Sequence, residues 1–167
     1  GNQLRQPYFI GTKVALRVNS WFEIGGNLVR QEGGPNLKQD GGNLGDAIFG
    51  GSEDSRSNTI AGIDLRFRVP QLRNAEIYAE YAGEDSARFW PFVESYLFGL
   101  FLPRLTASGK DDLRLEGLWA HQILYTDYKF PAGYTYHDMT PGHSQGGGTR
   151  ELFLRYSHWF DARNSLA

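Results

Sequence analysis

The sequence has no cysteine, no long apolar run and no excess of positive charge. Without cysteine, a disulfide framework and a thiolate metal site are excluded, while the cellular compartment stays open. The longest apolar run, residues 96–102, is far shorter than the ~20 residues of a transmembrane helix, so a membrane would have to be crossed by strands. A net charge of −2 with no basic stripe gives no reason to expect nucleic acid as a partner.

Glycine and aromatic residues are what the sequence has in abundance. The 167 residues include 21 Gly, 4 Trp, 9 Tyr and 11 Phe, and runs that favour helices are few. Glycine supplies turns, and aromatic side chains suit the pleated surface of a sheet. This composition favours β structure with many turns.

Seven segments alternate apolar and polar residues with the period of a strand. The clearest covers residues 59–69, where Ile63 and Leu65 lie on one face and Asp64 and Arg66 on the other. The pattern predicts an all-β, antiparallel up-and-down meander. Its expected strands are residues 8–18, 21–30, 59–69, 75–83, 92–102, 111–121 and 150–159.

The third and fourth expected strands form a hairpin around a short turn. One register places Arg68 opposite Glu76, and a slip by one pair places Arg66 opposite Glu80. Either register sets an arginine across from a glutamate on the polar face. Charge pairing is therefore expected, although the register itself stays open.

The connections between the expected strands alternate in length. The turns at residues 19–20, 70–74 and 103–110 are tight or modest, while those at 31–57, 84–91 and 122–149 are longer. Alternate connections of a meander lie at opposite ends, so the three longer ones share one end. Short turns at one end and long loops at the other are typical of outer-membrane barrels.

Charged side chains recur in mid-strand on the polar face. In a barrel they would line the lumen while the apolar face meets lipid, and strands near ten residues fit the ~9–11 needed to cross a bilayer. In a soluble antiparallel sandwich the same face would point at water, and alternation alone does not decide between the two. The expected lumen network is Asp64, Arg66, Arg68, Glu76, Glu80, Arg114, Glu116, Glu151 and Arg155. Aromatics near strand ends that suit interfacial girdles are Trp21, Tyr81, Trp90, Phe92, Trp119 and Trp159.

Three motifs in order along the chain carry a family resemblance. They are EYAGED at residues 80–85, DLRLE at 112–116, and GYTY at 133–136 with GHSQGG at 142–147. From about Ile60 to the C-terminus the chain resembles the capsule assembly protein family Wzi. The first sixty residues resemble the family mainly in general character and carry none of these motifs. The resemblance implies an outer-membrane β-barrel of eighteen strands in Gram-negative bacteria. It also implies a lectin-like, non-catalytic role in anchoring or organising capsular polysaccharide at the cell surface.

The chain is smaller than the family implies. Seven strands fall short of the even number, at least eight, that single-chain bacterial barrels use. Residues 1–10 lack the apolar region of a signal peptide, and residues 165–167 do not form a closing strand. Residues 1–167 are therefore expected to be one segment of a larger barrel, its C-terminal part, with two open sheet edges to be covered.

The stretch at residues 133–148 is the densest in hydrogen-bonding groups and in glycine. Its side chains, with those near residues 84–90, form the candidate carbohydrate site: aromatic rings would stack on sugar faces, and acids and histidines would bind hydroxyls. Alternatively, these tyrosines and histidines anchor a loop that folds into the barrel mouth. Gly146 to Gly148 are expected to permit a sharp turn through positive φ. The candidate residues are Glu84, Asp85, Trp90, Tyr134, Tyr136, His137, Asp138 and His143.

Other chemistries are less well supported by the sequence. A metal could use His137, Asp138 and His143, but their spacing matches no standard ligand pattern, so no metal or cofactor is expected. A glycoside hydrolase would need two flanking carboxylates, which Glu80, Glu84 and Asp85 could offer, and a charged lumen could conduct solutes. The expected function is a non-enzymatic protein of the bacterial outer membrane, with capsular or exopolysaccharide and membrane lipid as partners. The alternative is a soluble β-sandwich that binds or hydrolyses carbohydrate.

Overall fold

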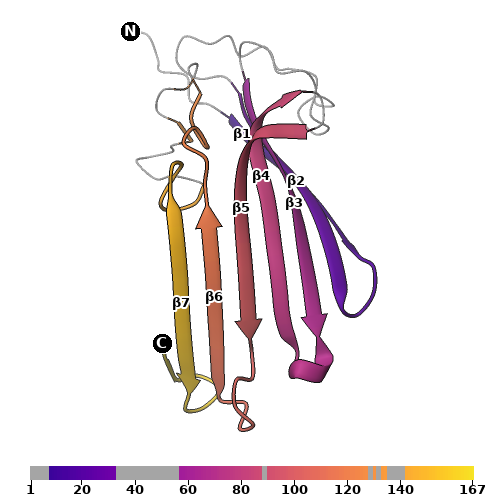
Figure 1. Ribbon diagram of the computed structural model, residues 1–167, viewed down its shortest axis with the longest axis vertical. Helices are drawn as coiled ribbons and strands as arrows, with labels where there is room; N and C mark the ends of the chain where they lie inside the picture. The colour runs from indigo at the N-terminus through magenta and orange to yellow at the C-terminus, as the bar shows by residue number, and fades with distance from the viewer. Residues whose placement is uncertain (1–7, 33–56, 88–89, 128–129, 131–132, 135–141) are drawn as a thin grey trace.

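The protein forms one antiparallel sheet in which each strand pairs with the next along the chain (Figure 1). The computed structural model describes residues 8–32, 57–87, 90–127, 130, 133–134 and 142–167, with the backbone alone at 8, 32, 85–87 and 90–92. The predicted all-β meander is confirmed, and the sheet is not closed. The strands are β1 (Tyr8–Arg17), β2 (Phe22–Glu32), β3 (Ser57–Val69), β4 (Ala75–Ala87), β5 (Trp90–Leu102), β6 (Asp111–Trp119), β7 (Arg150–Trp159) and β8 (Ser165–Leu166).

β1, β2 and β3 end or begin within one or two residues of the prediction, and the larger differences are at three other places. Residues 84–91 are not a loop, because the ladder continues through Ser86 opposite Pro91 and leaves only a short β4–β5 connection. β6 ends at Trp119: the Ala120 amide still donates to the Thr149 carbonyl at 2.8 Å, but the His121 amide donates to the Ser95 hydroxyl at 3.0 Å instead. β8 was not predicted, and it pairs through only two residues with the end of β7. A two-residue strand is too short to show a period.

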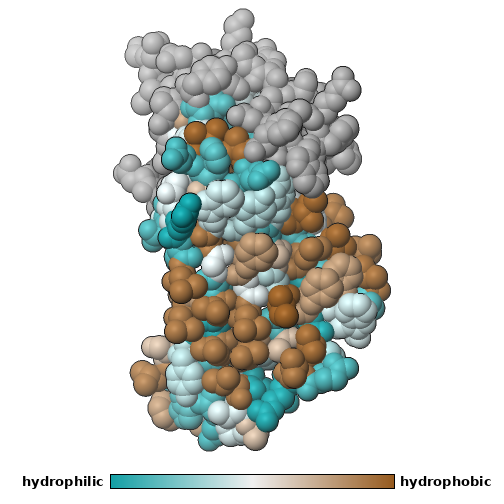
Figure 2. All heavy atoms as spheres, viewed as in Figure 1, coloured by the Kyte–Doolittle hydropathy of each residue, from teal (hydrophilic) through white to brown (hydrophobic). Residues whose placement is uncertain are grey.

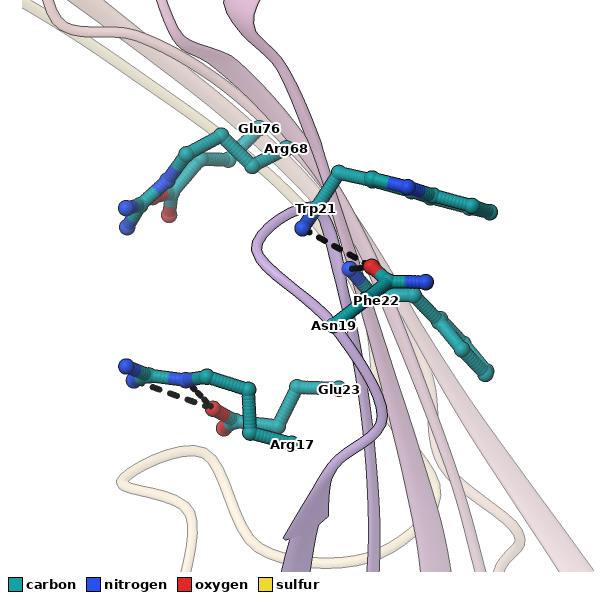
Figure 3. Close-up of polar contacts among 7 residues, drawn as sticks. All are labelled: Arg17, Asn19, Trp21, Phe22, Glu23, Arg68 and Glu76. Carbon is teal, nitrogen blue, oxygen red and sulfur yellow. Dashed lines mark hydrogen bonds and ion pairs between the residues drawn. The ribbon is translucent and has the colours of Figure 1, made fainter.

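The connections fall at two opposite ends, as the alternation predicted (Figure 1). At the short-turn end, Asn19 closes the β1–β2 turn: its Oδ1 accepts hydrogen bonds from the amides of Trp21 and Phe22, both at 2.9 Å (Figure 3). The β3–β4 turn uses the 3₁₀ helix η1 (Pro70–Leu72) followed by Arg73 and Asn74 at positive φ. The other end, the long-loop end, carries the β2–β3, β4–β5 and β6–β7 connections. Among the described residues, no helix is long and apolar enough to span a membrane.

The register separates the two faces of the sheet. Arg68 lies opposite Glu76, so the first of the two candidate registers is correct, and Arg66 lies opposite Tyr78 instead of Glu80. The Arg68 Nη2 and Glu76 Oε1 atoms are 2.6 Å apart. Carried across β3 to β7, this pairing puts all nine residues of the expected lumen network on one side, here called the charged face. In Figure 3, Arg17 and Arg68 project to this side and Trp21 and Phe22 to the other.

The opposite side, the apolar face, leaves large hydrophobic side chains uncovered. Leu152 is 76 % exposed, Val14 70 % and Phe98 61 %. Apolar residues cover the middle of the molecule in Figure 2, between more polar residues toward its ends. A contiguous exposed apolar surface of this kind marks an interaction with a membrane or another protein. Its members include Val14, Leu16, Ile24, Ile63, Phe67, Ile77, Phe98, Leu115, Leu152 and Leu154.

Aromatic side chains cluster on the apolar face toward each end of the strands. Near the long-loop end, the Tyr96 ring lies 5.5 Å from Trp119 and 5.4 Å from Tyr81. Near the short-turn end, Phe67 stacks with Phe22 at 4.6 Å and with Trp21 at 6.3 Å. The pattern is that of two interfacial girdles with a purely apolar zone between them. The side chains of Trp90 and Phe92, which the sequence also suggested, lie outside the described part.

One glycine of the charged face is required by its neighbour. A Cβ at Gly99 in β5 would overlap the ring of Tyr78, which crosses from β4 and donates its hydroxyl hydrogen bond to Glu116 in β6. In contrast, a Cβ at Gly117 in β6 would meet no atom within 4 Å. The Tyr78 ring therefore replaces the missing side chain of Gly99 and ties three strands together.

Gly99→Val is expected to destabilise the folded protein by about 1–3 kcal/mol, because the Tyr78 ring must be displaced. Gly117→Val is the matched control and should be tolerated, since its side chain enters open space. Denaturant titration in detergent or lipid compares the two. The explanation fails if both variants lose the same stability, or if adding Tyr78→Ala does not relieve the effect of Gly99→Val.

Candidate functional site

The β6–β7 connection folds back onto the charged face at the long-loop end. Leu124 and Tyr134, each 3 % exposed, pack with Ile60 of β3 and with Ala120 at the end of β6. These form the buried core of the described residues. Partly buried side chains from four strands and the connection itself complete it: Phe9, Val29, Ala82, Leu118 and Tyr125.

The change in the charged face along its length explains why the connection docks there. Nearer the short-turn end the face carries arginine and glutamate, whereas toward the long-loop end it carries small or apolar residues such as Val29, Ala82 and Leu118. Burying these against Leu124 and Tyr134 removes apolar surface from water at about 25 cal/mol per Å². The described residues of the docked connection thus cover the long-loop end of the charged face and leave its short-turn end open.

Hydrogen bonds from the sheet fix the path of the connection. Glu84 of β4 is 2 % exposed, and its Oε1 accepts the amide of Tyr125 at 2.6 Å. The Gln31 side chain of β2 donates to the carbonyl of Gly133 at 3.5 Å, and the Tyr134 hydroxyl donates to the carbonyl of Asn58 at 3.3 Å. A buried backbone group left without a partner costs free energy, so these contacts specify the docked position.

The glycines of the connection allow its tight turns. Gly133 has φ of 64°, and the next amide, that of Tyr134, donates to the Tyr125 carbonyl at 3.0 Å. The predicted positive φ is confirmed at Gly146 (71°) and Gly148 (69°) just before β7. Since residues other than glycine rarely adopt this conformation, the glycine run serves the chain path into β7.

Two of the candidate sugar-binding residues are buried in the docked connection. The Tyr134 ring packs at a tilt against Phe9 with ring centroids 5.2 Å apart, and the Glu84 carboxylate accepts the amide of Tyr125. In this arrangement their side chains hold the connection and offer little surface to a sugar. The alternative that the tyrosines anchor a folded-in loop therefore describes Tyr134.

His143 is the candidate residue that the structure leaves partly exposed. Its amide donates to the Tyr125 hydroxyl at 3.1 Å, and its Nε2 lies 3.8 Å from Glu151 Oε2 at the start of β7. Burial raises the pKa of the Tyr125 phenol, so it remains protonated at neutral pH. Tyr136, His137 and Asp138 lie outside the described residues, and of Asp85 and Trp90 the backbone alone is described.

Sequence reasoning missed the residues that anchor the connection from the sheet. Gln31, Asn58 and Ser95 are single polar residues on the charged face, and Tyr125 lies in a segment without periodicity. Their partners lie far away in the sequence, so no local spacing identifies them. Lys13, which lies 3.0 Å from Asp64, was also absent from the expected lumen network.

The open part of the charged face carries the remaining lumen network. Glu116 accepts the Tyr78 hydroxyl, and Arg114 lies 3.8 Å from the same carboxylate. The Arg114 guanidinium also lies over the Phe101 ring at 5.3 Å. Within the described residues, no three His, Asp or Glu side chains are arranged to hold a metal ion.

A comparison with protein families decides to which family the chain belongs. The family model described as capsule assembly protein Wzi matches residues 2–167. The chain belongs to the Wzi family. The match includes the first sixty residues, where the motifs alone gave little support, and Wzi membership supports a role in capsule assembly. Searches of curated proteins and of solved structures gave no match.

Proposed function

We propose that this Wzi-family chain is a segment of a larger outer-membrane β-barrel that binds or organises capsular polysaccharide at the surface of a Gram-negative bacterium. It acts as a binding protein and not as an enzyme. Its partners are capsular or exported polysaccharide and outer-membrane lipid. The observation that carries the proposal is the family match over residues 2–167, combined with a sheet that exposes one apolar face and one charged face.

The two faces support a membrane location. In water the exposed apolar face would favour aggregation, whereas in lipid it would be solvated by acyl chains. Aromatic clusters at both ends of this face match the positions of membrane interfaces. The charged face would then line the lumen, where its ion pairs remain in contact with water.

The docked β6–β7 connection supports a role at the long-loop end. Many separate contacts hold it against the sheet, from Glu84, Gln31 and the packed rings of Phe9 and Tyr134. A connection fixed in this way can present nearby polar groups, His143 and Glu151 among them, in a defined arrangement. Preorganised polar groups lower the entropic cost of binding a flexible glycan.

The proposed function is tested by removing the protein from an encapsulated strain that carries it. Cells without it should release capsule into the medium, and complementation should restore cell-attached polysaccharide. Equal amounts of attached capsule with and without the protein would contradict the proposal. As a control for assembly, the complementing protein must be located in the outer membrane, which is checked by fractionation and by a heat-dependent shift in gel mobility.

Deleting residues 133–148 is expected to weaken polysaccharide binding by the purified protein while the sheet still assembles. This segment contributes Tyr134 and His143 to the docked connection. Binding to purified capsular polysaccharide is measured beside the heat-dependent gel shift. Unchanged binding by a correctly assembled deletion variant would show that the glycan is held elsewhere.

A further inference from the structure

The charged face is positive near the short-turn end. Two cross-strand rows there contain five arginines and three glutamates, whereas the next row toward the docked connection contains the acids Asp64, Glu80 and Glu151. The described residues of the connection dock beyond this acidic row, where Leu124 and Tyr134 pack against Ile60. The first row comprises Arg17, Glu23, Arg66, Tyr78, Gly99, Glu116 and Phe153, and the second comprises Arg68, Glu76, Phe101, Arg114 and Arg155.

The glutamates do not satisfy all of these arginines. Arg68 has a close partner in Glu76, but Arg114 reaches Glu116 only at 3.8 Å, and Glu116 already accepts the Tyr78 hydroxyl. The Nε of Arg114 is buried without a hydrogen-bond partner in the described part of the chain. Arg114 also lies directly opposite Arg155, and like charges in this position repel unless an anion lies between them.

Arg66 forms a second positive position, on β3. It lines one small pocket with Arg17, Arg68 and Glu23 beside the Asn19 turn. Glu23 lies opposite Arg66 but pairs with Arg17 at 3.4 Å, and no ion pair joins Arg66 to a carboxylate within the described strands. The positions of Arg66 and Arg114 are three strand spacings apart, or about 14 Å across the sheet. This is the scale of a few sugar units, so two anionic groups of one chain could occupy both.

An aromatic surface lies between the two positions. The Tyr78 ring lies across Gly99, where it fills the space of the absent side chain, and its hydroxyl is fixed by Glu116. With one ring face against the backbone, the other faces the space above the sheet, and the residue is partly exposed. A rigid, partly exposed ring of this kind suits the C–H face of a sugar.

We propose that the short-turn end of the charged face binds an acidic glycan segment, with Arg66 and Arg114 holding its carboxylate or phosphate groups and Tyr78 holding a sugar ring between them. This inference rests on the proposed function and names the chemical class of the glycan. Guanidinium groups bind carboxylate and phosphate through paired hydrogen bonds, and no metal is needed. Binding here is separate from the docked connection at the long-loop end.

The test measures binding of purified capsular polysaccharide to the detergent-solubilised protein by calorimetry. Binding is also measured with the same polymer after its carboxylates have been chemically reduced, and after its phosphates have been removed. The treatment that lowers the affinity shows whether carboxylate or phosphate is the bound group. Arg66→Gln and Arg114→Gln should each weaken binding about tenfold or more, as expected for a lost hydrogen bond to a charged group. Arg163→Gln, in the turn before β8, removes the same charge elsewhere and should change affinity less than about twofold.

The outcomes separate this inference from the proposed function. The site is supported if the wild-type protein binds the untreated polymer tightly. This binding should weaken when the carboxylates are reduced or the phosphates removed, when salt is added, and in the Arg66 and Arg114 variants. Equal binding of treated and untreated polymer, unaffected by these variants, overturns the site while the proposed function stands. Failure of the wild-type protein to bind any form of the polymer contradicts both. Tyr78→Ala should weaken binding and Tyr78→Phe should largely retain it, because only the ring is needed.

Discussion

Leu100→Arg is expected to destabilise the folded protein in lipid by about 2–4 kcal/mol, or to prevent its assembly. Leu100 lies in the centre of the apolar face, between Ile77 on β4 and Leu115 on β6. If this face meets acyl chains, the guanidinium has no water and no carboxylate near it. The cost is measured by denaturant unfolding in lipid vesicles and by the heat-dependent gel shift.

Leu97→Arg is the matched control, with the same change of residue on the same strand. Leu97 lies on the charged face, opposite Glu80, where a new arginine can form an ion pair in contact with water. Its effect should be within about 1 kcal/mol. Equal destabilisation by the two variants, or a larger effect at Leu97, would contradict the assignment of the two faces.

Glu84→Ala is expected to loosen the β6–β7 connection by about 1.5–3 kcal/mol, the usual contribution of a hydrogen bond to a charged group. The buried carboxylate accepts the Tyr125 amide at 2.6 Å, and alanine leaves this amide without its partner. Hydrogen exchange at the Tyr125 amide reads the contact directly. It should become tens of times faster or more, with protease cleavage of the connection increasing in parallel.

Glu94→Ala provides the comparison for Glu84→Ala. Glu94 lies on the adjacent strand β5 and accepts the Tyr96 hydroxyl at 2.6 Å, but it makes no contact with Tyr125 in the described structure. Exchange at Tyr125 should therefore stay near the wild-type rate. If Glu84→Ala leaves the Tyr125 amide as protected as in the wild type, the carboxylate does not hold the connection.

The sequence was most informative about features that repeat with period two. Alternation predicted which side chains share a face. Opposite charges on neighbouring strands predicted that an arginine faces a glutamate across β3 and β4 in either of two registers, and the structure shows this pair to be Arg68 and Glu76. The sequence predicted the ends of the strands less reliably. Residues 84–91 follow a glycine and contain two acids and a proline, which are typical of loops, yet the pairing of β4 with β5 continues through them.

The role of Glu84 could not be predicted from local sequence. Its partner Tyr125 is 41 residues away, Asn58 and Tyr134 are 76 apart, and Gln31 and Gly133 are 102 apart. A glutamate at a strand end equally suits a sugar ligand and a buried anchor, and only the folded chain distinguishes them. The clustering of polar residues did identify the important connection. It made Tyr134 and Glu84 candidate sugar-binding residues, with anchoring of a folded-in loop as the alternative for the tyrosines, and the structure shows both side chains holding the connection.

The proposed membrane location depends most directly on which face of the sheet meets lipid. The chain has no cysteine, so single cysteines carrying a nitroxide label can be introduced along β5 in outer-membrane vesicles. Labels at 96, 98 and 100 should be accessible to oxygen dissolved in lipid, and labels at 97 and 101 to a water-soluble nickel chelate. Access of the nickel chelate to the labels at 96, 98 and 100 would contradict the account, because the apolar face would then be in water.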